Sequence, residues 1–308
     1  MHEKSTSFII VTLFALVVVC AVAMYFSLTI LPLPQPARPL SAPMAVPSPV
    51  QSTIQPLLHE IQPLADIPRL ALYPVQISNI IDTGYLALIN HQYSISAEPT
   101  GYLTPAWPNV PVSFIEGMYL HTTALQAVAD MLNSARNADM GSFFVSSGFR
   151  GVELQAELYA NDANRGFAMP PGHSEHHTGL AADIFPVGVS GARMAASAPG
   201  RWLAENSYRY GLILRYPKGA THITGIEFEP WHFRYVGRPH AYYMQRYGLV
   251  LEEYIELIRY TGGFSIRLDG RTYHVFHAMP NDGVLYLPSL AFTVSSDNTG
   301  GFIVTAKC

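Results

Sequence analysis

The sequence predicts an α+β protein in which a mixed or antiparallel sheet is flanked by helices, with a small β-rich appendage at the C-terminal end. Two observations predict this fold class. Over residues 75–261, helix-like and strand-like segments alternate without the regular strand–helix–strand repeat of a parallel sheet. From residue 262 onward the helical periodicity ends, and short β runs alternate with turn sequences. We therefore expect a mixed domain over residues 75–261 and a β-rich segment over residues 262–308.

The helices and strands of the mixed domain are each predicted from a local pattern. Residues 117–136 carry apolar side chains at helical spacing, which indicates an amphipathic helix. Further helices are expected over residues 152–163, 202–208, 238–247 and 252–260. Strands are expected over residues 85–89, 143–145, 181–185 and 212–216. Pro230 has no backbone donor, so we expect Glu229 to stand where a strand begins or bulges.

The β-rich segment begins with a hairpin signal. Two β runs, residues 265–268 and 272–276, flank Asp269-Gly270-Arg271. The stretches 281–283 and 297–301 are further turn sequences. This segment contains no motif that indicates its role.

The N-terminal part of the chain predicts a membrane anchor. A tail of residues 1–7 precedes an apolar run without charged residues over residues 8–31, and about 20 such residues span a bilayer as a helix. The alternative is a signal peptide cleaved after Ala23, but the apolar run continues past this residue, which favours a retained anchor. Proline recurs throughout residues 32–74, which predicts an extended, semi-rigid linker, and the alternative is a disordered connector without a function of its own.

Composition excludes some classes of partner. The net charge of −4 gives no basic surface, so nucleic acid is not an expected partner. The two cysteines, Cys20 and Cys308, lie in the apolar run and at the last residue, and we do not expect them to form a disulfide within the chain. No sequence feature indicates an obligate protein partner.

Two histidines and two carboxylates form the strongest chemical signal. His176 is followed by Asp183, and Glu229 is followed by His232. Catalytic zinc usually takes three protein ligands and keeps one position for water. His176, Asp183 and His232 would supply these ligands. Glu229 would remain as a general base beside the metal. The alternative is that the histidines are hydrogen-bonded structural groups or hold a structural zinc ion.

The flanking residues extend this signal into three motifs. They read Ser147-Gly148-Phe149-Arg150, Ser174-x-His176-x-x-Gly179-x-Ala181-x-Asp183, and Glu229-x-Trp231-His232-x-Arg234-Tyr235-Val236-Gly237. In these motifs the sequence resembles the VanY-type zinc D-alanyl-D-alanine carboxypeptidases, which share a fold with the D-Ala-D-Ala dipeptidases. The resemblance extends from about residue 86 to residue 258.

The resemblance implies a zinc D,D-peptidase (hedgehog-like) fold with Zn²⁺ as its cofactor. It implies that the metal ligands are His176, Asp183 and His232. It also implies that Glu229 is the catalytic base and that Arg150 is the cation facing the developing oxyanion.

The resemblance further implies that Ser174 and Gln155 contact the substrate, which would be a peptidoglycan stem peptide ending in D-Ala. The expected location is the cell membrane, with a single membrane span and the catalytic domain on the extracytoplasmic side. Because every motif residue precedes residue 262, we expect the zinc site to remain intact without the β-rich segment.

Three other functions remain open at this point. An L,D-carboxypeptidase of the same fold and a dipeptidase acting on free D-Ala-D-Ala would use the same zinc motif. A cell-wall binding protein with a structural zinc ion would not need Glu229. The Ser-x-x-Lys, His-Glu-x-x-His and Gly-x-Ser-x-Gly motifs are absent from the sequence, which disfavours serine-type D,D-peptidases, zincins and α/β-hydrolases.

Overall fold

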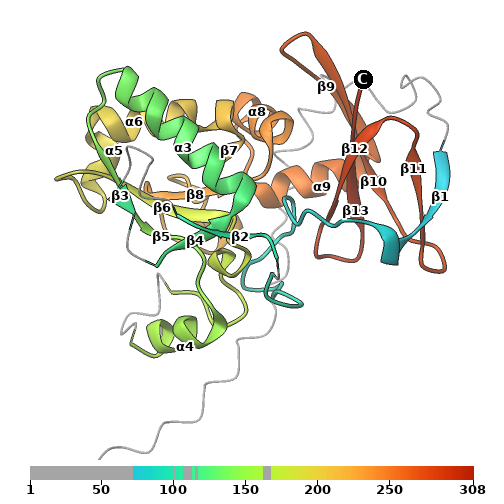
Figure 1. Ribbon diagram of the computed structural model, residues 1–308, viewed down its shortest axis with the longest axis horizontal. Helices are drawn as coiled ribbons and strands as arrows, with labels where there is room; N and C mark the ends of the chain where they lie inside the picture. Colours follow the sequence, from blue (N-terminus) through green and yellow to red (C-terminus); the bar gives the residue numbers. More distant parts are fainter. Residues whose placement is uncertain (1–71, 100, 107–112, 115–116, 162–167) are drawn as a thin grey trace, which may run out of the picture. The chain divides into compact units, whose positions relative to one another are not determined.

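Figure 1 shows the computed structural model, which describes residues 72–99, 101–106, 113–114, 117–161 and 168–308. The predicted tail (1–7) and anchor (8–31) lie outside these described residues, as does nearly all of the predicted linker (32–74). None of the helices in the described part of the chain combines the length and the apolar character needed to cross a membrane.

A five-stranded sheet carries the sequence motifs. Its strands, in their order across the sheet, are β3 (Ser113–Phe114), β5 (Phe143–Ser147), β6 (Ala181–Pro186), β8 (His232–Tyr235) and β7 (Leu212–Leu214). β3 and β5 are parallel, whereas the other neighbouring strands are antiparallel. The prediction of a mixed sheet is therefore confirmed.

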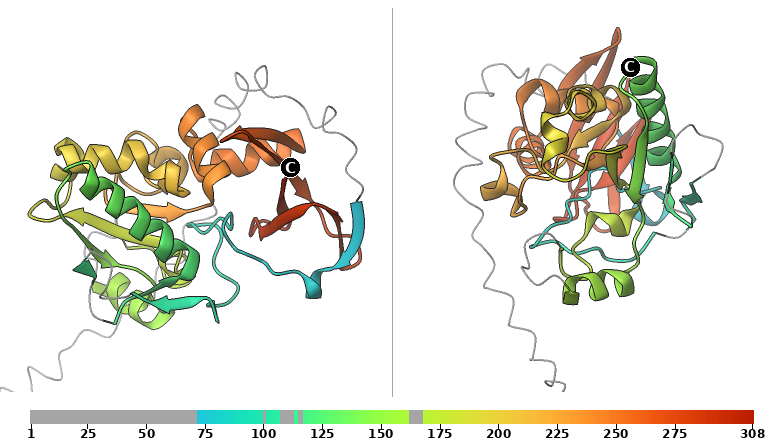
Figure 2. Two further views of the ribbon diagram at one scale, coloured as in Figure 1. Left: turned by 45° about the horizontal axis from the view of Figure 1, so that its top comes forward. Right: turned by 90° about the vertical axis from the view of Figure 1, so that its left-hand side faces the viewer.

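Helix α3 (Thr122–Asn137) lies across one face of this sheet, as Figures 1 and 2 show. Apolar residues spaced three or four positions apart form its buried face, as the sequence predicts. They pack against alternate residues of β6 and β8, namely Ala182, Ile184 and Phe233. Because successive side chains of a strand point to opposite faces, Asp183 and His232 lie on the face away from α3.

Short elements surround the sheet and complete this part of the fold. They are β2 (Leu103–Pro105), β4 (Tyr119–His121), α4 (Val152–Asn161), η3 (Glu175–Thr178), α5 (Arg193–Ala196), α6 (Ala198–Asn206), η4 (Ser207–Tyr210) and α7 (Thr221–Thr224). The helix predicted over residues 202–208 thus begins earlier, because Ser197 caps α6 by accepting a hydrogen bond from the amide of Gly200 at 3.1 Å.

The β-rich segment forms a four-stranded antiparallel sheet. Its order is β12 (Ala291–Ser296), β13 (Phe302–Lys307), β10 (Arg271–Ala278) and β9 (Gly263–Leu268). The predicted hairpin is confirmed: Asp269 and Gly270 both have positive φ, at 51° and 73°, as a two-residue type I′ turn requires.

Two further strands form a pair beside a short 3₁₀ helix. β1 (Leu72–Gln76) pairs with β11 (Val284–Pro288), and η2 (Ile77–Asn79) follows β1. The predicted boundary at residue 75 lies inside β1.

One hydrophobic core joins the β-rich segment to the helices that precede it. These are α8 (Arg238–Tyr247) and α9 (Leu251–Thr261), which confirm the two predicted helices. The core includes Tyr254 and Ile258 of α9 together with Phe264 of β9, Val275 of β10 and Ile303 of β13. Burial of α9 therefore depends on side chains that follow residue 262.

The strand predicted over residues 85–89 is wrong, since these residues form an irregular segment. Leu86 and Leu88 are buried, as the apolar pattern suggests, but the backbone pairs with no strand. Instead, the carbonyls of Gly84, Tyr85 and Ala87 accept hydrogen bonds from the guanidinium of Arg234 at 3.2–3.3 Å. A buried cation satisfies this backbone where a neighbouring strand would otherwise be needed.

Candidate metal centre and catalytic site

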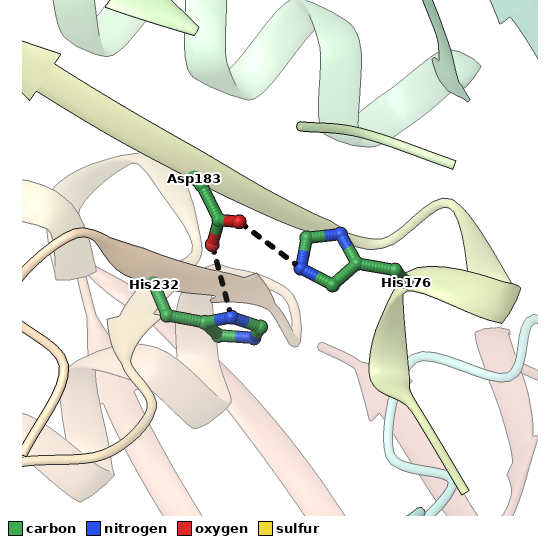
Figure 3. A group of neighbouring side chains, drawn as sticks. All are labelled: His176, Asp183 and His232. Carbon is green, nitrogen blue, oxygen red and sulfur yellow. Dashed lines mark ion pairs between the residues drawn. The ribbon is translucent and has the colours of Figure 1, made fainter. Parts of the chain in front are cut away.

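Three side chains predicted as zinc ligands meet at one point, as Figure 3 shows. Asp183 of β6 and His232 of β8 are cross-strand partners, and His176 extends from η3. Asp183 Oδ2 lies 3.4 Å from His176 Nε2, and Asp183 Oδ1 lies 3.1 Å from His232 Nδ1. One donor atom from each residue lies within 4.8 Å of the others.

The turn around His176 is built by its flanking residues. Ser174 caps η3, and its Oγ accepts a hydrogen bond from the amide of His176 at 3.3 Å. Gly179 ends η3 with a φ of 68°, and an added Cβ would lie 2.6 Å from Leu103 and 2.9 Å from the amide of His121. Only glycine fits this left-handed position, which sets the path from His176 to Asp183.

Each imidazole directs one ring nitrogen toward the other candidate metal ligands and the second ring nitrogen toward a hydrogen-bond acceptor. His176 Nδ1 lies 2.7 Å from the carbonyl oxygen of Gly148, which leaves Nε2 toward Asp183. His232 has the opposite orientation, since its Nδ1 faces Asp183 and its Nε2 lies 3.5 Å from Glu175 Oε2.

The donor set fits a zinc ion. Two imidazoles and one carboxylate are a usual ligand set for catalytic zinc. Burial would raise the pKa of Asp183, but the neighbouring His176 and His232 imidazoles hold this pKa well below its usual range. Asp183 Oδ1 is buried and has no hydrogen-bond partner among the described residues, so its lone pairs are free to bind a metal.

Glu229 lies beside this donor set without belonging to it. It precedes β8, and its Oε2 lies 3.6 Å from His232 Nδ1. The backbone is irregular here, as Pro230 predicts, because the amide of His232 donates back to the carbonyl of Glu229 at 3.3 Å. Burial raises the pKa of Glu229 to about 7, and Asp183 also raises it, while His232 and Arg150 act in the other direction. A carboxyl group with this pKa can accept and return a proton near neutral pH.

Arg150 lies at the same cavity and is held by two neighbours. Its Nη1 donates to Gln155 Oε1 at 2.7 Å, and its Nη2 donates to Ser147 Oγ at 2.8 Å. Gln155 is fully buried and donates from Nε2 to the carbonyl of Met169 at 2.6 Å. The amide of Gln155 therefore already binds Arg150 and the backbone, and its clearest role in the structure is to orient Arg150.

The predicted site residues line one cavity of about 420 Å³. Arg150, Gln155, Ser174 and Glu229 reach it together with the three candidate ligands. An apolar cluster of Met169, Tyr216 and Ile226 forms another part of its wall. The structure thus brings together every residue that the sequence assigns to the site.

Three buried charges lie behind the ligands, and the sequence analysis assigns a role to none of them. Glu175, Arg215 and Arg234 are almost entirely inaccessible to solvent. Arg215 Nε donates to Glu175 Oε1 at 2.8 Å, and Arg234 Nη1 lies 3.0 Å from the same oxygen. In the sequence, Glu175 is an acidic residue at a variable position between two motif residues, and Arg234 is a fixed residue of the third motif.

Comparison with known proteins gives consistent matches. The sequence profile of VanY, described as D-alanyl-D-alanine carboxypeptidase, matches residues 117–238. A D-alanyl-D-alanine carboxypeptidase of Enterococcus faecium is 36% identical over 190 residues, which cover 61% of this chain and 61% of that protein. The putative carboxypeptidase YodJ of Bacillus subtilis (strain 168) is 35% identical over 192 residues, which cover 56% of this chain and 68% of that protein. The chain thus matches about three-fifths of the length of the Enterococcus faecium relative.

A solved structure shares the fold. The vancomycin resistance D,D-dipeptidase VanXYg, in complex with a D-Ala-D-Ala phosphinate analogue, superposes with a TM-score of 0.67 at 24% identity. The match covers 78% of this chain and 100% of that structure. The predicted fold of a zinc D,D-peptidase domain with a C-terminal antiparallel sheet is therefore confirmed.

Proposed function

The chain belongs to the VanY D-alanyl-D-alanine carboxypeptidase family, and from this premise we propose that it is a zinc-dependent carboxypeptidase that removes the terminal D-Ala from peptidoglycan stem peptides. One observation carries the proposal. The Glu229 carboxylate lies beside the His176–Asp183–His232 donor set, in the same cavity as the Arg150 guanidinium. A purely structural zinc site would need neither group.

The side chains present can perform each part of amide hydrolysis. His176, Asp183 and His232 would hold a zinc ion, which would act as a Lewis acid that lowers the pKa of a water molecule and polarises the scissile carbonyl. Glu229 accepts the proton of the attacking water and passes it to the amine of the departing D-Ala. Arg150, fixed by Gln155 and Ser147, offers a cation to the oxyanion that forms at the carbonyl oxygen.

The test uses the full chain, purified with zinc and incubated separately with a UDP-linked pentapeptide stem and a UDP-linked tetrapeptide stem. We expect mass spectrometry to show loss of one alanine from the pentapeptide only. Shortening of the tetrapeptide alone would identify an L,D-carboxypeptidase, and release of the D-Ala-D-Ala dipeptide would identify a dipeptidase. Zinc binding without hydrolysis of either stem would overturn the enzymatic proposal.

We propose further that residues 8–31 hold the enzyme at the cell membrane, with the catalytic domain on the extracytoplasmic side. The support is the length and apolar character of this run and the proline-rich segment that follows it. A tagged full-length chain should fractionate with membranes, and a chain that begins after residue 31 should not. Equal distribution of both forms would contradict the anchor.

A further inference from the structure

Glu175 is a buried carboxylate whose two oxygens have different surroundings. Its Oε1 accepts a hydrogen bond from Arg215 Nε at 2.8 Å and lies 3.0 Å from Arg234 Nη1. Its Oε2 lies 3.5 Å from His232 Nε2. Two guanidinium groups therefore bind one oxygen, and the other oxygen faces a candidate metal ligand.

The contact between Glu175 and His232 joins two atoms that lack other partners. Glu175 Oε2 and His232 Nε2 are both buried, and neither makes a hydrogen bond to any other group in the described part of the chain. A buried polar group without a hydrogen bond destabilises the folded state, so each atom is the natural partner of the other. A small movement of the two side chains toward each other would form a hydrogen bond between His232 Nε2 and Glu175 Oε2.

We propose that Glu175 is a positioning residue for His232: its Oε2 accepts a hydrogen bond from the protonated Nε2, which leaves the lone pair of Nδ1 for the metal. This inference rests on the zinc site of the proposed function. In a neutral imidazole one nitrogen carries the proton and the other is free to bind a metal. The nitrogen that must be free here is Nδ1, because it is the one that faces Asp183.

His176 shows the same arrangement with a different acceptor. Its Nδ1 lies 2.7 Å from the carbonyl oxygen of Gly148, which leaves Nε2 free to face Asp183. Both candidate ligands thus have an acceptor opposite the nitrogen that does not bind metal. Such partners orient a metal-binding histidine and increase its basicity.

The two arginines explain why the carboxylate cannot turn away from His232. Arg215 uses its other nitrogens to donate to both oxygens of Glu252, the second residue of α9, at 2.8 and 2.6 Å. Arg234 donates to three carbonyls of the 84–87 segment. Glu175 is therefore held from two directions, and its Oε2 stays aimed at the imidazole.

The substitution Glu175→Gln tests the inference because its geometry is predictable. Both arginines require an acceptor, so the amide oxygen of glutamine should occupy the position of Oε1. The amide NH₂ group then faces His232 Nε2 and donates to it, which places the imidazole proton on Nδ1. That proton blocks the metal-binding atom, and we expect zinc affinity, measured by competition with a chromophoric chelator, to fall about 10–100-fold.

Glu252→Gln is the matched control. It removes a carboxylate from the same Arg215 but leaves the contact between Glu175 and His232 in place. If Glu175 acts only by balancing the buried arginines, both variants should lose thermal stability in the metal-free state and bind zinc alike. Equal zinc affinity in wild type and Glu175→Gln, or equal losses in the two variants, would overturn the inference.

A measurement on the zinc-loaded wild type covers the case in which Glu175→Gln does not fold. Nitrogen-15 NMR should show the His232 ring bound through Nδ1, with a slowly exchanging proton on Nε2. A ring bound through Nε2, or an Nε2 proton that exchanges freely, would overturn the inference. Failure of the wild type itself to bind zinc would instead overturn the proposed function, and the role of Glu175 with it.

Discussion

Asp183 and His232 lie directly opposite each other on the antiparallel strands β6 and β8, with Asp183 Oδ1 3.1 Å from His232 Nδ1. Sheet register thus sets the distance between two candidate zinc ligands that are far apart in the sequence. A slip of one residue would turn one of these side chains to the face packed against α3. The core side chains Ala182 and Phe233 oppose such a slip, because it would expose them.

Replacing His232 by alanine should abolish zinc binding with little loss of the fold. Two ligands hold zinc far more weakly than three, and the sheet retains its apolar core on the α3 face. Zinc content after dialysis and circular dichroism of the same sample check both parts. A variant that keeps one zinc ion per chain would contradict the ligand assignment. His176→Ala should behave in the same way.

The variant Glu229→Gln should keep its zinc and lose turnover. The amide has nearly the same shape as the carboxylate but cannot accept the proton of the attacking water. General base catalysis contributes about 10²–10⁴-fold, and we expect kcat on a D-Ala-D-Ala stem to fall by that factor. Zinc content measured beside the rate separates this loss from loss of metal. Activity equal to that of wild type would contradict the assignment of the base.

The role of Gln155 can be separated into substrate binding and orientation of Arg150. Gln155→Glu keeps an acceptor for Arg150 Nη1, whereas Gln155→Ala removes it. If Gln155 orients Arg150, the alanine variant should have a lower kcat, because loss of one group that stabilises the oxyanion typically lowers kcat about 10²–10³-fold. The glutamate variant should retain more of the wild-type kcat. If Gln155 binds substrate directly, as the sequence predicts, both variants should raise KM instead. Steady-state kinetics on one stem peptide decide between these roles.

A buried histidine away from the metal centre should make stability depend on pH. His240 of α8 lies between the Tyr254 hydroxyl at 2.7 Å and Thr305 Oγ1 at 3.0 Å, and burial lowers its pKa from 6.5 to about 3. Below pH 6.5 the unfolded chain therefore binds a proton that the folded chain does not. The free energy of unfolding should fall as pH decreases from about 6.5 toward 3, by up to about 1.4 kcal/mol per pH unit.

Urea unfolding of the metal-free protein between pH 6.5 and pH 4.5 measures this effect. His240→Gln should reduce the pH dependence, whereas His222→Gln, at an exposed position, should preserve it. The same slope in wild type and His240→Gln would show that another group is responsible. Working without metal avoids a contribution from zinc release in acid.

Local sequence patterns predict the ligands well but not the groups behind them. His176, Asp183, His232 and Glu229 are recognisable because each lies inside a motif with fixed spacing. Glu175 is not, since its partners are Arg215, which directly follows β7, and Arg234 of β8, and they meet it only in the folded chain. A single sequence does not reveal such long-range pairs.

The strand wrongly expected over residues 85–89 has a related cause. Its alternating apolar residues, Leu86 and Leu88, are buried as a strand pattern predicts. Its backbone, however, bonds to the side chain of Arg234 and to groups of the β-rich segment, namely the side chains of Ser295 and Asn298 and the carbonyl of Asp297. Hydrophobic alternation predicts which side chains are buried, but it does not predict what the backbone hydrogen-bonds to.

The last prediction concerns a chain that ends at residue 261. Every motif residue precedes this point, so the sequence predicts that the zinc site remains intact. The hydrophobic core that α8 and α9 share with the β-rich segment instead predicts that the zinc site is lost. Phe264, Ile266, Val275 and Ile303 pack with the last two helices, and Leu257 and Ile258 of α9 are completely buried. Full burial of one large apolar side chain stabilises by about 1.5–3 kcal/mol, and the whole free energy of unfolding of a domain is about 5–15 kcal/mol.

Losing four core partners should therefore unfold this part of the protein, and we expect a chain of residues 72–261 to be insoluble or to lack a cooperative thermal transition. The matched control is a chain of residues 72–308, which retains every described element. It should unfold cooperatively and bind zinc, because β1 and the core remain complete. A chain of residues 72–261 that binds zinc and unfolds cooperatively would instead show that the β-rich segment is dispensable for the zinc site, as the sequence alone suggests.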